Sequence, residues 1–246
     1  MNRVSKEIIL LFASFSLILS MTACAIQQCR NLGKGGKPKA NLLDAHERMT
    51  ESENRMAIWQ AKYDEHGNLI ELKCFGPNGQ LQEDQFGVAI RKNLYDALGN
   101  MIESSHYAID ERLKEDNHGV AILRFKWDKY GSKNEVRRYG ANGQLKEDIS
   151  AIAIVRNIHD RNGNWIESRY YGIDGKLKEN INGVAIQRFK RDEYGRVIEI
   201  GYYDINGSLT EDKESGCAIE RGKWDEHGDW INKECRDRNG KIVIKE

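Results

Sequence analysis

Apolar and polar residues alternate along residues 55–246, and the pattern returns at a nearly fixed interval. Alternation with a period of two predicts β-strands. Each copy opens on an apolar segment with an Ala-Ile pair, and six such pairs at steps of 32, 32, 32, 32 and 33 residues predict a repeat architecture. The pairs are Ala57-Ile58, Ala89-Ile90, Ala121-Ile122, Ala153-Ile154, Ala185-Ile186 and Ala218-Ile219.

Two turns are predicted in each copy. Asp can cap a turn with its side chain, and Gly can take the positive φ that other residues avoid. The first turn has Asp followed three residues later by Gly: Asp64/Gly67, Asp96/Gly99, Asp128/Gly131, Asp160/Gly163, Asp192/Gly195 and Asp225/Gly228. The second is a strong hairpin signal, Asn-Gly or Asp-Gly, at Asn78-Gly79, Asn142-Gly143, Asp174-Gly175, Asn206-Gly207 and Asn239-Gly240. The second copy has Asp110-Glu111 instead, which predicts a strained turn or another turn type.

These turns divide each copy into three short antiparallel strands, and the register of the first hairpin has two solutions. A four-residue turn sets the basic residue of the first strand opposite the Glu of the second. A bulged turn with Gly in the left-handed region makes the same contacts diagonal. The pairs in question are Lys92/Glu103, Arg124/Glu135, Arg156/Glu167 and Arg188/Glu199. The third strand holds Leu81, Leu113, Leu145, Leu177, Leu209 or Ile242.

The predicted fold class is all-β, an elongated antiparallel β-hairpin repeat array in the form of a twisted sheet or a β-solenoid-like structure. Hydrophobic residues make up 39% of the chain and charged residues 31%, which favours a thin sheet over a compact globule. Residues 41–54 have Leu42, Leu43, Ala45 and Met49 near helical spacing. We therefore expect a short N-terminal helix there that caps the open edge of the array.

Residues 1–23 are typical of a bacterial signal peptide. Arg3 and Lys6 precede an apolar run, residues 8–20, that is too short to span a bilayer as a helix. The segment that ends in Ala23-Cys24 follows and resembles the lipobox of bacterial lipoproteins. The resemblance implies cleavage after Ala23, lipidation of Cys24 and anchoring in the outer membrane. The alternative is an ordinary signal peptide with a cysteine nearby.

Three regions follow from this pattern. Residues 1–23 are the signal peptide, and residues 24–54 are the lipidated tether with its helical cap. Residues 25–40 are rich in Gly and Lys, which indicates a flexible spacer. Residues 55–246 form the repeat domain, with copies at 55–86, 87–118, 119–150, 151–182, 183–215 and 216–246.

The turn segments of the copies resemble a known repeat family. Residues 63–70 (YDEHGNLI) and 95–102 (YDALGNMI) are similar to the YD repeats of bacterial Rhs-type proteins. The resemblance covers residues 55–246 through a short motif, and His159 and Arg191 replace its Tyr in two copies. It implies β-hairpin strips that wrap, scaffold or bind carbohydrate, and it brings no catalytic residues with it.

Charge and candidate chemistry narrow the function classes. The chain has 38 basic and 38 acidic residues, so it has no global field that would recruit nucleic acid. The turn sequence lacks the oxygen density of calcium loops, and no two His have metal-ligand spacing on one element. We expect no catalytic residues, no metal and no cofactor.

Cysteine and tryptophan are the remaining candidates for sites. Cys217 and Cys235 fall at the outer ends of the two strands of one hairpin, so a disulfide between them is plausible in an oxidising envelope. A thin sheet cannot bury every aromatic side chain, which suggests an aromatic binding surface for glycan or protein. Its indoles would be Trp59, Trp127, Trp165, Trp224 and Trp230, and the alternative is that they form the core stripe.

The sequence predicts a non-enzymatic envelope lipoprotein, anchored to the membrane by lipid and facing the periplasm or the cell surface. It would act as a scaffold or protein-binding module, with a protein partner that the sequence does not identify. One alternative is a periplasmic immunity lipoprotein that neutralises a toxin. Another is a glycan-binding or glycan-active protein. The oligomeric state does not follow from the sequence.

Overall fold

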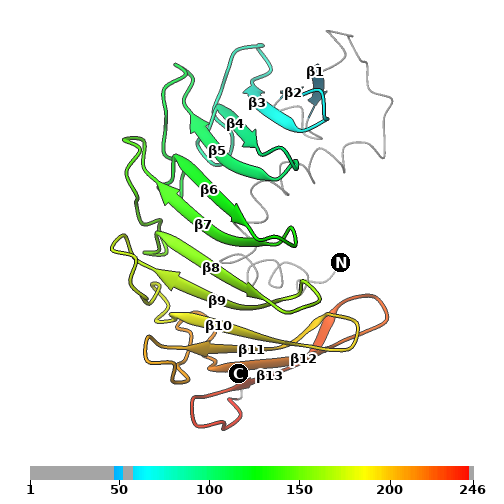
Figure 1. Ribbon diagram of the computed structural model, residues 1–246, viewed down its shortest axis with the longest axis vertical. Helices are drawn as coiled ribbons and strands as arrows, with labels where there is room; N and C mark the ends of the chain where they lie inside the picture. Colours follow the sequence, from blue (N-terminus) through cyan, green and yellow to red (C-terminus); the bar gives the residue numbers. More distant parts are fainter. Residues whose placement is uncertain (1–46, 52–57, 244–246) are drawn as a thin grey trace. The chain divides into compact units, whose positions relative to one another are not determined.

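The computed structural model describes residues 47–51 and 58–243, and its regular elements in that part of the chain are all β-strands (Figure 1). The strands are antiparallel, and each is hydrogen-bonded to its neighbours in sequence order. The predicted all-β hairpin array is therefore confirmed. The strands are β1 (Glu47–Glu51), β2 (Ile58–Tyr63), β3 (Leu69–Phe75), β4 (Ile90–Tyr95), β5 (Met101–Tyr107), β6 (Ile122–Trp127), β7 (Lys133–Tyr139), β8 (Ile154–His159), β9 (Trp165–Tyr171), β10 (Ile186–Arg191), β11 (Val197–Tyr203), β12 (Ile219–Trp224) and β13 (Trp230–Arg236).

The helical cap expected within residues 41–54 is wrong where the structure describes that segment. Residues 47–51 form β1, which pairs with β2 in the register Glu47↔Lys62 to Glu51↔Ile58. The main chain of β2 would otherwise present unpaired hydrogen-bonding groups at a sheet edge, and pairing with β1 satisfies them. This tertiary demand overrides the weak helical spacing. The signal peptide, Cys24, Cys29 and the tether lie outside the described residues.

The first turn is bulged in copies one and three to six. In the β6–β7 hairpin Lys126 lies opposite Glu135 and Arg124 opposite Arg137, and the register shifts before Trp127. The same shift occurs in β2–β3, β8–β9, β10–β11 and β12–β13. Gly131 takes a φ of 80°, as the bulged turn requires. The direct pairing of Arg124 with Glu135 is therefore wrong, as are those of Arg156 with Glu167 and Arg188 with Glu199. The bulged register is confirmed, but the three arginines bond glutamates of the preceding copy and not their diagonal neighbours.

The turn Asp caps the bulged turn with its side chain. Asp160 Oδ1 accepts hydrogen bonds from the main-chain N–H groups of Asn162 and Asn164, both at 2.9 Å, and its Oδ2 accepts from Asn164 Nδ2 at 3.0 Å. These bonds satisfy N–H groups that the turn leaves without main-chain partners. The capping role predicted for this Asp is confirmed.

The predicted third strand is shorter than expected. It consists of a single bridge in each copy, such as Tyr139↔Leu145 and Tyr171↔Leu177, after which the chain runs into the turn that precedes the next copy. Asp148 caps that turn by accepting from the N–H groups of Ser150 and Ile152. In the second copy Glu111 adopts a φ of 61°, so its turn is of the same kind as the others but has a non-glycine residue in the left-handed region.

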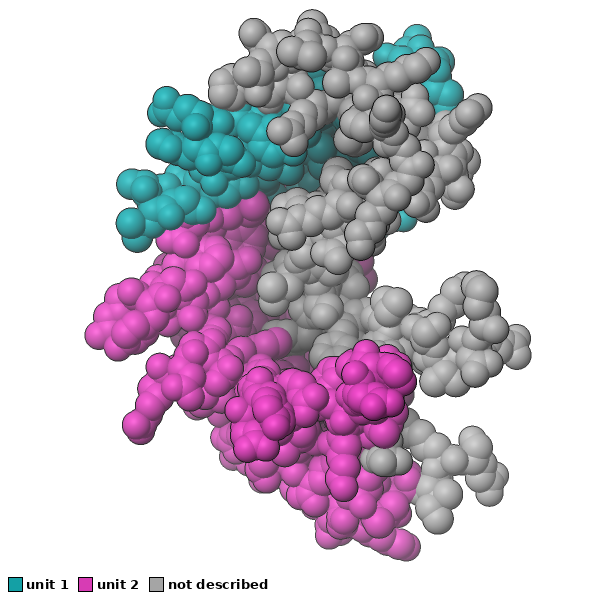
Figure 2. Space-filling view, turned by 90° about the vertical axis from the view of Figure 1, so that its right-hand side faces the viewer, with its two compact units in different colours: residues 1–99, 104–117 teal, residues 100–103, 118–246 magenta. Residues whose placement is uncertain are grey.

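The chain divides into two compact units, coloured teal and magenta in Figure 2. The first contains residues up to 99 together with 104–117, and the second contains residues 100–103 together with 118–246. In unit 2 the side chains of Leu123, Phe125, Val136 and Val155 are buried, and they come from alternate positions on one side of the strands. No helix among the described residues is long and apolar enough to cross a membrane.

Candidate binding face

The side of unit 2 opposite its apolar core carries a repeated array of charged and tyrosine side chains, which we call the ladder face. Directly paired residues of antiparallel strands project to the same side, so the register assigns its members. They are Glu103, Arg124, Lys126, Glu135, Arg137, Tyr139, Arg156, Glu167, Arg169, Tyr171, Arg188, Lys190, Glu199, Tyr203, Arg221, Lys223, Glu234 and Arg236.

Glu135, Glu167 and Glu199 of the ladder face each divide their two carboxylate oxygens between two copies. Glu135 Oε1 accepts from Arg137 Nε of its own strand at 2.7 Å, and Oε2 accepts from Arg156 Nε of the next hairpin at 2.8 Å. Glu167 repeats the arrangement with Arg169 at 2.6 Å and Arg188 at 2.8 Å. Arg156 and Arg188 thus pair with the glutamate of the preceding copy, whereas Lys126 and Lys190 pair with the glutamate of their own copy.

Tyrosines extend this pattern by stacking on the same arginines. The guanidinium carbon of Arg124 lies 4.7 Å from the ring centre of Tyr139, that of Arg156 lies 4.6 Å from Tyr171, and that of Arg188 lies 4.3 Å from Tyr203. A guanidinium held by a carboxylate and stacked on a ring has little rotational freedom left. The ladder face therefore presents ordered arginines.

The cations of the ladder face cover its carboxylates. The Glu135 side chain is 8% exposed, whereas Arg156 is 43% and Lys126 64% exposed. Burial alone would raise the pKa of Glu135, but hydrogen bonds from Arg137, Arg156 and Lys126 outweigh it and lower that pKa to about 2. The pKa values of Glu167 and Glu199 are lowered by the same kind of partners.

The ladder face is basic, although the whole chain is neutral. It carries five carboxylates, Glu103, Glu135, Glu167, Glu199 and Glu234, against ten cations, Arg124, Lys126, Arg137, Arg156, Arg169, Arg188, Lys190, Arg221, Lys223 and Arg236. Apart from the pair Glu234 and Arg236, the cations are also more exposed than the carboxylates that they contact. A partner that approaches this side therefore meets a positive surface.

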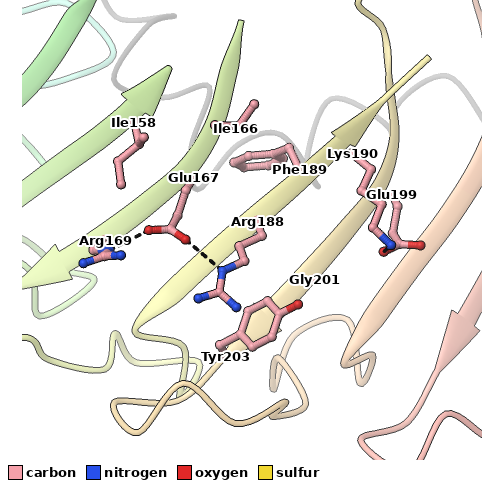
Figure 3. Close-up of a pocket in the computed structure, with 10 residues that line it drawn as sticks. All are labelled: Ile158, Ile166, Glu167, Arg169, Arg188, Phe189, Lys190, Glu199, Gly201 and Tyr203. Atoms are coloured by element: carbon pink, nitrogen blue, oxygen red, sulfur yellow. Dashed lines mark hydrogen bonds and ion pairs between the residues drawn. The ribbon is translucent and has the colours of Figure 1, made fainter. Parts of the chain in front are cut away.

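A pocket of about 440 Å³ opens on the ladder face across β8 to β11. Figure 3 shows Glu167 between Arg169 and Arg188, with the ring of Tyr203 beside Arg188. Ile158 and Ile166 line the pocket together with the charged residues, and Phe189, whose ring packs on Trp165 on the core side, forms part of its wall. At Gly201 the repeat pattern has lost the arginine that copies three and four carry at residues 137 and 169.

Two of the five candidate tryptophans hold neighbouring hairpins together through their indole N–H groups. Trp127 Nε1 donates to the carbonyl of Met101 at 2.8 Å, and Trp224 Nε1 donates to that of Val197 at 2.6 Å, so each ties its hairpin to the preceding one. Arg191 takes this place in copy five and donates to the carbonyl of Trp165. This explains why arginine can replace the aromatic residue there.

The expectation that these indoles form an exposed surface does not fit their positions. Trp59, Trp127, Trp165 and Trp224 are half-buried, and Trp230 is buried. Trp165 donates to Ser168 Oγ at 2.8 Å and its ring centre lies 4.5 Å from that of Phe189. Stacking and hydrogen bonding within the sheet draw the rings inward. Ligand binding by these residues stays a prediction.

The cysteines are placed as follows. Cys217 and Cys235 form a disulfide between the segment that enters β12 and strand β13, with their Cα atoms 5.3 Å apart. Cys74 is buried with a free thiol, and burial raises its pKa. No group of three potential metal-ligating side chains occurs in the described part of the chain.

Buried polar pairs on the core side escaped the sequence analysis. In unit 1 His106 Nδ1 lies 3.5 Å from Asp116 Oδ2, with both side chains almost fully buried. In unit 2 Arg138 Nε lies 2.8 Å from Asp148 Oδ2. Strand alternation in the sequence could have shown that His106 and Arg138, on the second strands of their hairpins, face the core side. The aspartates belong to the turns between copies, so only the fold brings the pairs together.

The fold and the ladder face define this chain as a β-hairpin repeat protein. No protein-family model matches it, and no curated protein matches it. Solved structures that match include TcdB2-TccC3-TEV, with 14% identity and a TM-score of 0.40 over 85% of this chain and 10% of that chain. TcdB2-TccC3 without its hypervariable C-terminal region matches with 13% identity and a TM-score of 0.39, over 79% and 11%.

A third similar structure is the Photorhabdus luminescens Tc holotoxin pore with a mutation in TccC3, with 12% identity and a TM-score of 0.34 over 78% and 11% of the two chains. The present chain thus spans about a tenth of the length of the chains it resembles. At these identities and TM-scores the likeness carries no argument about function.

Proposed function

We propose that this chain is a non-enzymatic protein-binding module or scaffold of the bacterial cell envelope. The observation that carries the proposal is the ladder face, in which ordered arginines and tyrosines recur on one side of the sheet. Arginine and tyrosine are enriched in protein interfaces, where they supply most of the binding energy. A face whose arginines are already fixed loses less conformational entropy on binding.

Capture of partners from an envelope extract tests this proposal. We expect the double substitution Arg156→Gln and Arg188→Gln to abolish capture, because it removes two adjacent guanidinium groups of the ladder face. The matched control is Lys129→Gln with Arg161→Gln, which removes the same charge from exposed turns. Circular dichroism checks that both variants fold. Equal capture by the two variants would exclude the ladder face as the binding surface.

We also propose that Cys24 carries the lipid that anchors the protein, with palmitate among its acyl chains. The small residues before Cys24 and the preceding apolar run support this. Several acyl chains would anchor the protein stably, where a single chain gives only reversible binding. Labelling of growing cells with radioactive palmitate tests it: Cys24→Ser should lose the label and Cys29→Ser should keep it. Label that persists in Cys24→Ser would contradict the proposal.

A further inference from the structure

Two departures from the repeat pattern meet in the pocket of the ladder face. Ile158 stands where copies three and five have Lys126 and Lys190, and its side chain is 40% exposed. Gly201 stands where copies three and four have Arg137 and Arg169. The two positions are 43 residues apart in sequence, yet both line the same pocket. Ile158 thus places an apolar side chain, and Gly201 no side chain, where other copies have a cation.

The surroundings of the pocket remain basic. Arg169, Arg188 and Lys190 line it beside Glu167 and Glu199, so cations outnumber carboxylates. The carboxylates are already engaged: Glu167 by two arginines, and Glu199 by Lys190 at 2.7 Å and by Arg221. A ligand that brought further positive charge would have to displace one of these cations, whereas a ligand with carboxylates would complement them.

From this arrangement we infer that the pocket takes an apolar side chain from an acidic segment of a partner protein. The apolar side chain would lie on Ile158 and Ile166, beside the ring of Tyr203. Acidic residues on either side of it in the segment would contact the arginines of the ladder face. The inference rests on the proposed protein-binding function and specifies the partner's chemistry.

The empty position at Gly201 gives the pocket its shape. A Cβ atom at residue 201 would stand 3.0 Å from Cε2 and from the hydroxyl oxygen of Tyr203, so the tyrosine ring leans over the glycine. An arginine there would push the ring aside and enter the pocket. Because residues 137 and 169 already carry arginine within equivalent strands, Gly201→Arg restores the regular repeat and should fold.

Binding of labelled synthetic peptides to the full chain, followed by fluorescence anisotropy, tests the inference. The probes are a short glutamate-rich peptide with one central Phe, the same peptide with Ser in place of Phe, and a lysine-rich version of the first. We expect the acidic Phe peptide to bind roughly tenfold more tightly than the Ser peptide, because burial of one aromatic side chain contributes at least that factor. The lysine-rich peptide should not bind.

Gly201→Arg should remove the preference for Phe and leave the affinity for the acidic Ser peptide unreduced. Ser208→Arg adds the same charge at an exposed turn residue outside the pocket, and it should keep the preference. Equal binding of the Phe and Ser peptides to the unaltered protein would overturn the inference, as would a preference that survives Gly201→Arg. Competition by polygalacturonate or by anionic vesicles as strong as that by the Phe peptide would also overturn it.

These outcomes separate the inference from the proposed function. Partner capture that depends on Arg156 and Arg188 but shows no peptide preference would leave the binding module standing and remove the pocket from its mechanism. If the protein prefers the Phe peptide but captures partners equally well without the two arginines, the pocket stands as a peptide site, and the ladder-face arginines are excluded as the surface that captures envelope partners.

Discussion

Glu135 shows how one residue joins two copies of the repeat. Its carboxylate lies beneath Lys126, Arg137 and Arg156, which hold its pKa at about 2. The sequence places a basic residue and a glutamate at corresponding strand positions, but it does not reveal which pair is in contact. The bulge shifts the register within each hairpin, and this shift directs Arg156 to the preceding copy.

Neutralising this carboxylate should destabilise the fold at neutral pH. Glu135→Gln leaves cations without their shared partner, and we expect the free energy of unfolding to fall by roughly 2 kcal/mol in urea titrations. The folded-state pKa lies below the ordinary value of 4.5, so the carboxylate stabilises the fold above 4.5 and loses that effect as the pH falls towards about 2.

The variant should accordingly show a shallower loss of stability over that pH interval than the unaltered protein. Glu226→Gln, at a carboxylate that is 86% exposed, serves as the control and should change neither quantity. Parallel pH profiles for Glu135→Gln and the unaltered protein would show that the ion pairs of Glu135 contribute nothing to folding.

At the level of the element, the turns carry most of the information that the sequence holds. The Asp and Gly positions fixed the hairpin boundaries in advance, because a positive φ strongly restricts which residue can occupy a turn. The helical cap was wrong and the third strand is shorter than predicted, because both depend on contacts that a local pattern does not encode. A single bridge satisfies the third segment, and β1 forms only because β2 offers its edge.

Within residues 58–243, two turns have a residue other than glycine in the left-handed region, and replacing it with glycine should stabilise the protein. Glu111 has a φ of 61° and Ala151 a φ of 64°. Relief of this strain exceeds the extra entropy of glycine in the unfolded chain, so Glu111→Gly and Ala151→Gly should each add about 0.5–1 kcal/mol to the free energy of unfolding.

The matched control should change the stability of the protein in the opposite direction. Gly143 occupies the turn position equivalent to Glu111 with a φ of 74° and has no atom within 4 Å of an added Cβ, so Gly143→Ala measures the backbone strain alone. It should lower the melting temperature, whereas the two glycine substitutions raise it. A melting temperature that stays unchanged or falls in both glycine variants would refute the account of strain.

On the scale of the whole molecule, charge is distributed unevenly between surfaces. The 38 basic and 38 acidic residues cancel in the sum over the chain, while the ladder face has twice as many cations as carboxylates. Composition therefore gave the net charge of the chain correctly but did not reveal the positive charge of the ladder face. Strand alternation was visible in the sequence, but the pairing between hairpins that collects these residues into one face was not.

We expect strand β13 to depend on its disulfide, because β12 is its one neighbouring strand in the described sheet and its other side has only the bridge between Arg236 and Ile242. The Cys217–Cys235 bond closes 18 residues of sequence, a span for which a disulfide contributes about 3 kcal/mol. Replacing both cysteines by alanine should accelerate amide hydrogen exchange in β13 and leave β8 and β9 unchanged. Equal acceleration in all three strands would show that the array unfolds as one cooperative body.

The sharing of each glutamate between neighbours has a consequence for how such a chain can change in length. If residues 151–182 were deleted, Glu135 would meet Arg188 in place of Arg156, and the same kind of ion pair would form across the new junction. Insertion of a duplicate would add one more junction of the same chemistry. Gain or loss of 32 codons by recombination between copies of the gene segment would thus yield a chain in which the Glu–Arg ion pairs between neighbouring copies all form. Loss of half a copy would leave one of these residues without its partner.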